Sequence, residues 1–503
     1  MRDSMIRRLV LLAWIGLAAV ATAQDGALTP AQIERIRSEF RMDAHMRAMR
    51  NALTSTGIRD IAENREILAA HNRQFSHKIK TKGISNQKSS GRCWMFAGFN
   101  TIKPVVLNKL DLDDFEFSHI YLQFWDKMEK ANAFLEYMIE YRDRDIQDRD
   151  VVFLLKDPAP DGGYWENFVD LVNKYGVLPR EAMAETASSE NTGMMNRTLA
   201  RILRKDAVEL RDIYRETGSV RKMREAKPAM LAEVYRVLVL NLGEPPVEFA
   251  WRHKAKDKGH KDDEKQADEE QVEDEDDAPD EENDEDEADE EPEDDYDVEQ
   301  NWSELRIFTP KAFYSEFVAL DLGQYVNIAD DPIRPKGGHY EIGLTKNLYD
   351  GQNAHYANVD VQMLKDLVVR VLLDNKPVYF AADVSSDQDS KAGIMARNLY
   401  DYESIYALDM GLNKTERLLF RDSTINHGMA FIGVDLADGR PVKWLVENSW
   451  GSDRGSGGLW TMYDDWFVDN VYNIIVHRDY VPDEVRRVLE LPAEKLPVWD
   501  PMW

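Results

Sequence analysis

The chain has 503 residues, of which 43% are hydrophobic and 10% aromatic, so it can bury a large core in two or three domains or in one catalytic domain with insertions. Its formal net charge is −30, but 26 acidic residues and one lysine, Lys265, fall between Asp262 and Glu299, which gives that segment a charge of −25. The rest of the chain sums to about −5, and this near-neutral body excludes the basic surface expected of a nucleic-acid-binding protein.

The first 23 residues are typical of a secretory signal peptide. Arg7 and Arg8 give the positive start, residues 9–20 form an apolar stretch, and residues 21–23 (Ala-Thr-Ala) offer a cleavage site before Gln24. We therefore expect a secreted or periplasmic mature protein without membrane contact after cleavage. An uncleaved anchor is the alternative reading, although the apolar stretch is short for a membrane span.

Residues 29–73 are predicted to be helical. Thr29 and Pro30 suit the cap and the first position of a helix, and the apolar residues that follow recur on one face among charged residues. We interpret residues 24–75 as an N-terminal helical arm that packs on the body.

Cys93 is the lone cysteine of the chain, so no intramolecular disulfide can form. An unpaired thiol in an exported protein is a liability unless it is buried or used. A buried structural cysteine is common. Whether Cys93 has a structural or a chemical role must therefore be judged from the residues around it.

The first half of the chain is rich in helical patterns and the last third in strand patterns. Helices are predicted at 93–107, 117–137, 165–175 and 196–241, and strands at 378–382, 429–434, 443–447 and 459–462. This separation indicates the α+β class rather than alternating α/β. The acidic segment between the two halves cannot bury apolar area and is expected to be disordered.

The segment from Gln87 to Trp94 is the first candidate for chemistry. If Cys93 begins the helix that follows, its thiolate faces unpaired backbone N–H groups and the positive end of the helix dipole, which lower the thiol pKa. The N–H of Cys93 and the side-chain amide of Gln87 could then form an oxyanion hole.

Two later motifs could complete this site. His427 begins an apolar strand, and a thiolate needs a partner that exchanges protons near neutral pH. His119 and His339 also border apolar sequence, and a lone histidine in such a place is more often a core residue. The amide of Asn448 could orient an imidazole, and Trp450 could cover that hydrogen bond, although the same residues also suit a plain turn.

Together these motifs resemble the bleomycin hydrolase and bacterial aminopeptidase C branch of the papain-like cysteine peptidases. The resemblance rests on Arg92 directly before Cys93, on the spacing of 334 residues from Cys93 to His427, and on the Asn-Ser-Trp-Gly sequence from Asn448. Further similar stretches are residues 124–127, 161–163, 175–177 and 496–502. The similarity extends from about residue 35 to 503, interrupted by the acidic segment.

The resemblance implies a papain-like two-lobed fold, with a helical lobe, a β-barrel-like lobe and a large helical insertion. It implies Cys93 as nucleophile, His427 as base, Asn448 as the group that orients the base and Gln87 as oxyanion donor. The implied reaction is hydrolysis of N-terminal residues from peptides by acyl transfer, without metal or other cofactor. The chain also lacks the His-Glu-x-x-His motif of zinc peptidases.

The resemblance further implies a homohexamer and a C-terminal tail that reaches the active-site cleft. Here the sequence departs from the family pattern, because it stops at Trp503, whereas family members usually continue for several residues. An exported dipeptidyl peptidase or endopeptidase with a more open cleft, a hydrolase of other amides, and an inactive exported scaffold therefore remain alternatives.

These expectations give a domain plan. It comprises a signal peptide (1–23), the helical arm (24–75), a helical lobe (76–195), a helical insertion (196–252), a disordered acidic tract (253–300), a β lobe (301–490) and a C-terminal tail (491–503).

Overall fold

The computed structural model describes residues 26–254 and 302–502. The predicted signal peptide lies outside the described residues, and so does the acidic tract except for its first two residues. The chain divides into two units: one comprises residues up to Glu63 together with Asp401–Asp409, and the other comprises Asn64–Tyr400 and Met410–Trp503.

The smaller unit is helical. It contains α1 (Pro30–Glu39), α2 (Ala44–Leu53), α3 (Ile58–Ala62) and α14 (Tyr402–Tyr406). As predicted, Thr29 caps α1: its hydroxyl accepts from the Gln32 backbone at 3.2 Å, and its own N–H donates to the Gln32 side chain at 2.7 Å. The predicted arm is thus helical, but its residues from Asn64 onward belong to the larger unit.

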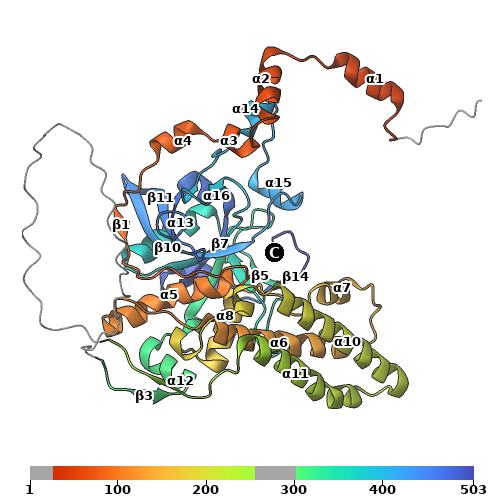
Figure 1. The fold of residues 1–503 in the computed structure, drawn as a ribbon, viewed down its shortest axis with the longest axis vertical. Coiled ribbons are helices and arrows are strands. Elements are labelled where there is room, and N and C mark those ends of the chain that lie inside the picture. The colour runs from red at the N-terminus through yellow and green to blue at the C-terminus, as the bar shows by residue number, and fades with distance from the viewer. Residues whose placement is uncertain (1–25, 255–301, 503) are drawn as a thin grey trace, which may run out of the picture. The chain divides into compact units, whose positions relative to one another are not determined.

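The larger unit is built on a mixed β-sheet (Figure 1). Among the described residues, the strand order is β14-β5-β6-β4-β13-β7-β10-β11-β12-β9-β8, and β1 pairs with β10. The strands are β1 (His77–Lys78), β4 (Tyr325–Ala329), β5 (His339–Ile342), β6 (His355–Asn358), β7 (Val378–Ala382), β8 (Gln388–Asp389), β9 (Ile394–Met395), β10 (His427–Ala437), β11 (Arg440–Glu447), β12 (Leu459–Tyr463), β13 (Val471–His477) and β14 (Glu494–Leu496). A separate ribbon pairs β2 (Phe249–Trp251) with β3 (Arg306–Phe308).

Helices of the first half of the chain cover one face of this sheet (Figure 1). They are α5 (Cys93–Leu110), α6 (His119–Glu140), α7 (Arg149–Lys156), α8 (Trp165–Tyr175), α9 (Ala187–Glu190), α10 (Gly193–Thr217) and α11 (Val220–Leu242), and the short α12 (Pro310–Phe313) of the second half packs into the same core. The helix α5 packs directly on β7 and β10, and α10 and α11 pack against α6. The predicted helical stretch 196–241 is two helices, because the chain turns at Gly218, whose φ is 61°.

Helices of the second half pack on the other face and along the edges of the sheet. They are α13 (Val361–Leu373), α15 (Lys414–Leu419), α16 (Asp464–Asn470) and α17 (Asp483–Leu489), with α4 (Arg65–Ala70) from the N-terminal side. Short 3-10 turns at 180–182, 322–324 and 478–480 and a π turn at 314–318 complete the unit. No helix within residues 26–254 and 302–502 combines the length and apolar character needed to cross a membrane.

The alternation of β7 shows how the sheet separates two cores. Phe380 and Ala382 are buried with α13 and α16 on one face, and Tyr379 is buried with the helices of the first half on the other. Because successive strand residues point to opposite faces, Ala381 shares the face of Tyr379. That face is the one against which α5 begins, and it holds the candidate site.

A glycine at the end of α8 is required by both conformation and space. Gly176 has φ 78° and ψ −163°, and a Cβ added there would lie 2.5 Å from the Lys311 nitrogen. We expect Gly176→Ala to lower the free energy of unfolding by about 3 kcal/mol, from left-handed strain plus overpacking. Chemical denaturation would measure the loss.

Gly218 provides the matched control for this prediction. It also has a positive φ, of 61°, but no atom lies within 4 Å of an added Cβ. Gly218→Ala should therefore cost only about 1 kcal/mol, the strain alone. Equal losses for the two variants would contradict the steric argument.

Candidate active site

Cys93 is the first residue of α5, as the sequence predicts. The turn is closed by the N–H groups of Met95 and Phe96, which donate to the Arg92 carbonyl at 2.9 and 3.1 Å. The N–H of Trp94 donates to the Cys93 sulfur, so the thiol meets the positive end of the helix. Cys93 is half-buried and lines a cavity of about 850 Å³.

His427 is the first residue of β10, opposite Ala382 of β7, and its ring is hydrogen-bonded to the Cys93 thiol. Its Nε2 lies 2.8 Å from Oδ1 of Asn448. A carbonyl oxygen can only accept, so Nε2 carries the hydrogen and donates it. The other ring nitrogen, Nδ1, is therefore the one that meets the sulfur.

The charges of this pair stabilise each other. Burial raises the pKa of the Cys93 thiol, but the hydrogen bond and charge of His427, with the N–H groups of Gly428 and Trp94, outweigh burial and hold the pKa below its ordinary value. Burial alone would lower the pKa of His427, yet the bonds to Cys93 and Asn448 raise it. A thiolate and an imidazolium therefore coexist over a wider pH range than free side chains allow.

The Asn448 segment fixes the imidazole. Asn448 is 1% exposed, and its Oδ1 also accepts from the Ser449 N–H at 2.8 Å, which leaves the amide little freedom to turn. The Trp450 ring lies 4.9 Å from the His427 ring and 5.3 Å from that of Trp460. As predicted, an indole shields the histidine beside its amide partner.

A buried ion pair connects the nucleophile helix to this segment. Lys103 of α5 lies 3.1 Å from Glu447, which ends β11 directly before Asn448, and both side chains are almost fully buried. Lys103 also donates to the Gly83 carbonyl at 2.9 Å. The helix that carries Cys93 and the strand that carries Asn448 are thus held together by charge.

The side-chain amide of Gln87, the predicted oxyanion donor, is fixed by two hydrogen bonds. Its Oε1 accepts from the Ser449 hydroxyl at 2.7 Å, and its Nε2 donates to the Ser90 carbonyl at 2.7 Å. An amide nitrogen has two hydrogens, so one remains for a substrate oxygen. Gln87 and Cys93 both line the cavity. The structure therefore brings together all four predicted site residues.

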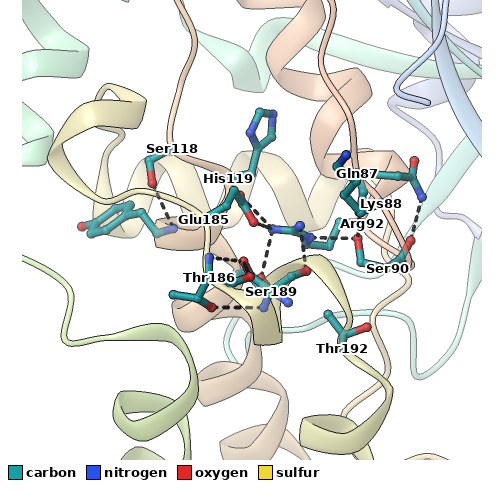
Figure 2. Close-up of polar contacts among 12 residues, drawn as sticks. Gln87, Lys88, Ser90, Arg92, Ser118, His119, Glu185, Thr186, Ser189 and Thr192 are labelled. Atoms are coloured by element: carbon teal, nitrogen blue, oxygen red, sulfur yellow. Dashed lines mark hydrogen bonds and ion pairs between the residues drawn. The ribbon is translucent and has the colours of Figure 1, made fainter. Parts of the chain in front are cut away.

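Arg92, which is 1% exposed, holds the loop before Cys93 in place through its hydrogen bonds (Figure 2). Its guanidinium donates to the Ser90 hydroxyl, Gln123, Glu185 and the Ser189 carbonyl, at 2.9–3.1 Å. Figure 2 shows the guanidinium between the loop of Gln87–Ser90 and the segment of Glu185–Ser189. The arginine that the sequence singles out beside the nucleophile therefore fixes the backbone on which the nucleophile stands.

Asp161 also holds this loop, through hydrogen bonds with the residues that flank Arg92 and Cys93. Its carboxylate accepts from the Gly91 N–H at 3.2 Å and pairs with Lys127 at 2.7 Å, and its carbonyl accepts from the Trp94 indole at 2.8 Å. Burial opposes the charge of Asp161, but Lys127 outweighs burial and lowers the carboxyl pKa far below its ordinary range. Two of the similar stretches, 124–127 and 161–163, thus contact each other through this pair.

The two other candidate histidines lie elsewhere. His119 stacks on Phe96 with ring centroids 3.6 Å apart, and burial followed by the charge of Arg92 lowers its pKa. His339 contacts the Leu491 carbonyl at 2.7 Å. Neither is among the described residues that line the cavity.

The sequence did not point to several polar and small residues that line the cavity. They are Asn327, Tyr379, Gly428 and Asn473, from β4, β7, β10 and β13. Val471–His477 is an apolar stretch interrupted by Asn473, and nothing in a single sequence shows that this asparagine faces a cleft.

The C-terminal tail packs beside the site. β14 pairs with β5, and Met502 is buried with Tyr340 and Tyr356 in a cluster against which Ile425, a cavity residue, also packs. Through Met502, no tail residue is among the described residues that line the cavity. That the tail reaches the cleft stays a prediction.

Within residues 26–254 and 302–502, no group of three or more His, Cys, Asp or Glu side chains is placed to hold a metal ion. The site combines a thiol at a helix N-terminus, an imidazole at a strand start and an amide that fixes the imidazole. This arrangement, on helices packed against a sheet, defines a papain-like cysteine peptidase.

Comparisons with known proteins agree. The model of the Peptidase C1-like family matches residues 27–274 and 293–503. Aminopeptidase C of Streptococcus thermophilus is 32% identical over 93% of this chain and 97% of its own, and human bleomycin hydrolase is 32% identical over 95% and 98%. The crystal structure of PepW from Lactobacillus rhamnosis HN001 is similar with a TM-score of 0.83, 32% identity, and coverage of 95% and 99%. The chain belongs to the Peptidase C1-like family.

Alkylation of the lone cysteine tests the thiolate. We expect the iodoacetamide rate to reach half its maximum at a pH below the ordinary thiol pKa of about 8.5, because His427 stabilises the anion. His427→Gln removes that charge, so the midpoint should rise by about one pH unit or more. Cys93→Ala should take up no label. Coincident profiles of the wild type and His427→Gln would contradict the ion pair.

The Arg92 clamp predicts a stability effect that depends on its partner. Arg92→Met leaves the carboxylate of Glu185 without its cation, and we expect a loss of about 3 kcal/mol in the free energy of unfolding. Replacing Glu185 by Met as well should recover part of that loss, since no uncompensated charge remains. Denaturant unfolding of the two single variants and the double variant gives the coupling. Additive losses would mean that the pair does not interact.

Proposed function

We propose that this protein is an exported cysteine aminopeptidase that removes single residues from the N-termini of peptides. The observation that carries the proposal is the hydrogen-bonded series from Cys93 to His427 to Asn448 at the edge of a cavity large enough for a peptide end. The names of the relatives, aminopeptidase C and bleomycin hydrolase, support the reaction class. The signal-like N-terminus supports export.

The proposed reaction uses these groups in two steps. The Cys93 thiolate attacks the carbonyl carbon, and the oxygen that becomes negative accepts hydrogen bonds from the Cys93 N–H and the free Gln87 amide hydrogen. The C–N bond breaks as the His427 imidazolium protonates the leaving amine. His427, now neutral, takes a proton from water, and the hydroxide attacks the thioester. The carboxylic acid leaves, and the proton held by His427 again pairs with the Cys93 thiolate.

A peptidase that cleaves only substrates with a free α-amino group requires a group in the cavity that recognises this amine. By resemblance, we propose a homohexamer in which the terminal carboxylate of the tail binds the α-amino group of the substrate. A second candidate, a dipeptidyl peptidase or endopeptidase, is favoured by one observation: up to Met502, the cavity lining includes no tail residue.

Single-residue release tests the choice. We would compare wild type and Cys93→Ala under reducing conditions, on amino-acid anilides with a free amine and on the same compounds with a blocked amine. Cleavage by wild type of the free-amine compounds alone is the expected result, with a preference of at least about a hundredfold. Cleavage of blocked substrates at a comparable rate would establish the second candidate.

A further inference from the structure

The sheet face beside the catalytic histidine forms a path of small residues that ends at a polar group. Gly428, which follows His427 on β10, lies opposite Ala381 of β7, and Ala381 lies opposite Asn473 of β13. Residues paired in this way point to the same face, and all three line the cavity. Glycine and alanine leave the path from His427 to Asn473 unobstructed by long side chains.

A second row runs beside the first. Ala430 of β10 lies opposite Tyr379, Tyr379 opposite Ile475, and Ile475 opposite Asn327 of β4. Tyr379 and Asn327 also line the cavity, and Trp165 lies beside Tyr379 with ring centroids 5.6 Å apart. The path therefore has aromatic surface along it and two asparagines at its end.

The two asparagines and a buried acid form one oriented chain. Nδ2 of Asn473 donates to Oδ1 of Asn327 at 2.9 Å, and the Asn327 side chain in turn donates to the carboxylate of Glu166. Asn473 and Asn327 are 4% and 3% exposed, and Glu166 is 7% exposed. Each amide thus turns its N–H groups toward the carboxyl group of Glu166.

The free end of this chain is an acceptor. Oδ1 of Asn473 has no hydrogen-bond donor among the described residues, and neither has Oε2 of Glu166. Leaving a buried acceptor without a donor is unfavourable, and a donor on a bound ligand would remove that cost. An acceptor at the end of a chain that begins with a carboxylate favours a cationic donor over a neutral one.

We propose that Asn473, Asn327 and Glu166 form a specificity site for the cationic side chain of a lysine or arginine on the amino side of the cleaved bond. The proposal rests on the proposed peptidase function and names a substrate class for it. Glu166 acts through Asn327 and positions the amide chain, whereas Asn473 contacts the substrate.

The distance between Gly428 and Asn473 favours binding of a long cationic side chain, rather than the α-amino group of the substrate, at Asn473. Neighbouring strands lie about 4.8 Å apart, so Gly428 and Asn473 are separated by about 10 Å across β7. The α-amino group is adjacent to the carbonyl that Cys93 attacks and stays near Gly428. The end of a lysine or arginine side chain reaches across, with its methylene groups against Tyr379 and Trp165. Burial raises the pKa of Glu166, and a bound cation would stabilise its ionised form.

The test compares substrates that differ in charge and little in shape. Lysine is paired with norleucine and arginine with citrulline, as amino-acid anilides and as dipeptide anilides with leucine second. We expect kcat/KM of wild type to favour the cationic member of each pair by about tenfold or more in at least one series. Equal values within twofold in both series would overturn the proposal.

Two variants address the chain of amides. Glu166→Gln keeps the shape and removes the charge, and Asn473→Leu removes the acceptor; each should lower the lysine-to-norleucine ratio about tenfold, while norleucine substrates are still cleaved. Ile475→Val, on the same strand and face, is the matched control and should keep the ratio. Unchanged ratios in both Glu166→Gln and Asn473→Leu would overturn the assignment of these residues.

A binding measurement separates this inference from the proposed function. Calorimetry with Cys93→Ala compares the affinity of lysine- and norleucine-initiated peptides without turnover. If wild type cleaves none of the substrates but Cys93→Ala still prefers the lysine peptide, the aminopeptidase proposal fails and the specificity site stands. If Cys93→Ala binds both peptides equally, the specificity site is refuted whatever the activity.

Discussion

The close approach of α5 to β10 is the constraint on which the site depends. At Gly428, a Cβ would lie 3.4 Å from the Trp94 Cα and 3.0 Å from the Tyr379 hydroxyl, so the strand has room for the start of the helix because this residue has no side chain. That approach brings Cys93 to His427 from a distance of 334 residues in sequence. The ion pair between Lys103 and Glu447 holds the neighbouring residue Asn448 close to α5. The contacts of Arg92 and Asp161 hold the loop from which α5 begins.

Much of the fold could be predicted because its patterns are local. β7 matches the predicted strand 378–382, and α5, α6 and α8 begin within two residues of their predicted starts. The strands β4, β5, β6 and β13 were not predicted. They are short or carry polar residues such as Asn327, His339 and Asn473, and those at the cleft are polar because they face a cavity rather than a core. A pattern search for buried strands passes over such segments.

The residues of the candidate site could be predicted from the sequence, but the side chains that support them could not. Cys93, His427 and Asn448 each stand in a local sequence that carries information about their chemistry, such as a helix start or a strand start. By contrast, Arg92 meets Glu185 and Lys127 meets Asp161 through tertiary packing, and no periodicity in one sequence records which acid a base will meet. The family resemblance marked these stretches, and the structure supplies the physical reason.

The solitary thiol also determines how the protein responds to oxidants. A thiolate with a lowered pKa and partial exposure is readily oxidised to a sulfenic acid. Many redox-tolerant enzymes then form an internal disulfide, from which a reductant recovers the thiol. This chain has no second sulfhydryl to capture the sulfenic acid. Recovery therefore depends on a small external thiol that arrives before further oxygen is added, and without one the loss of the nucleophile is permanent.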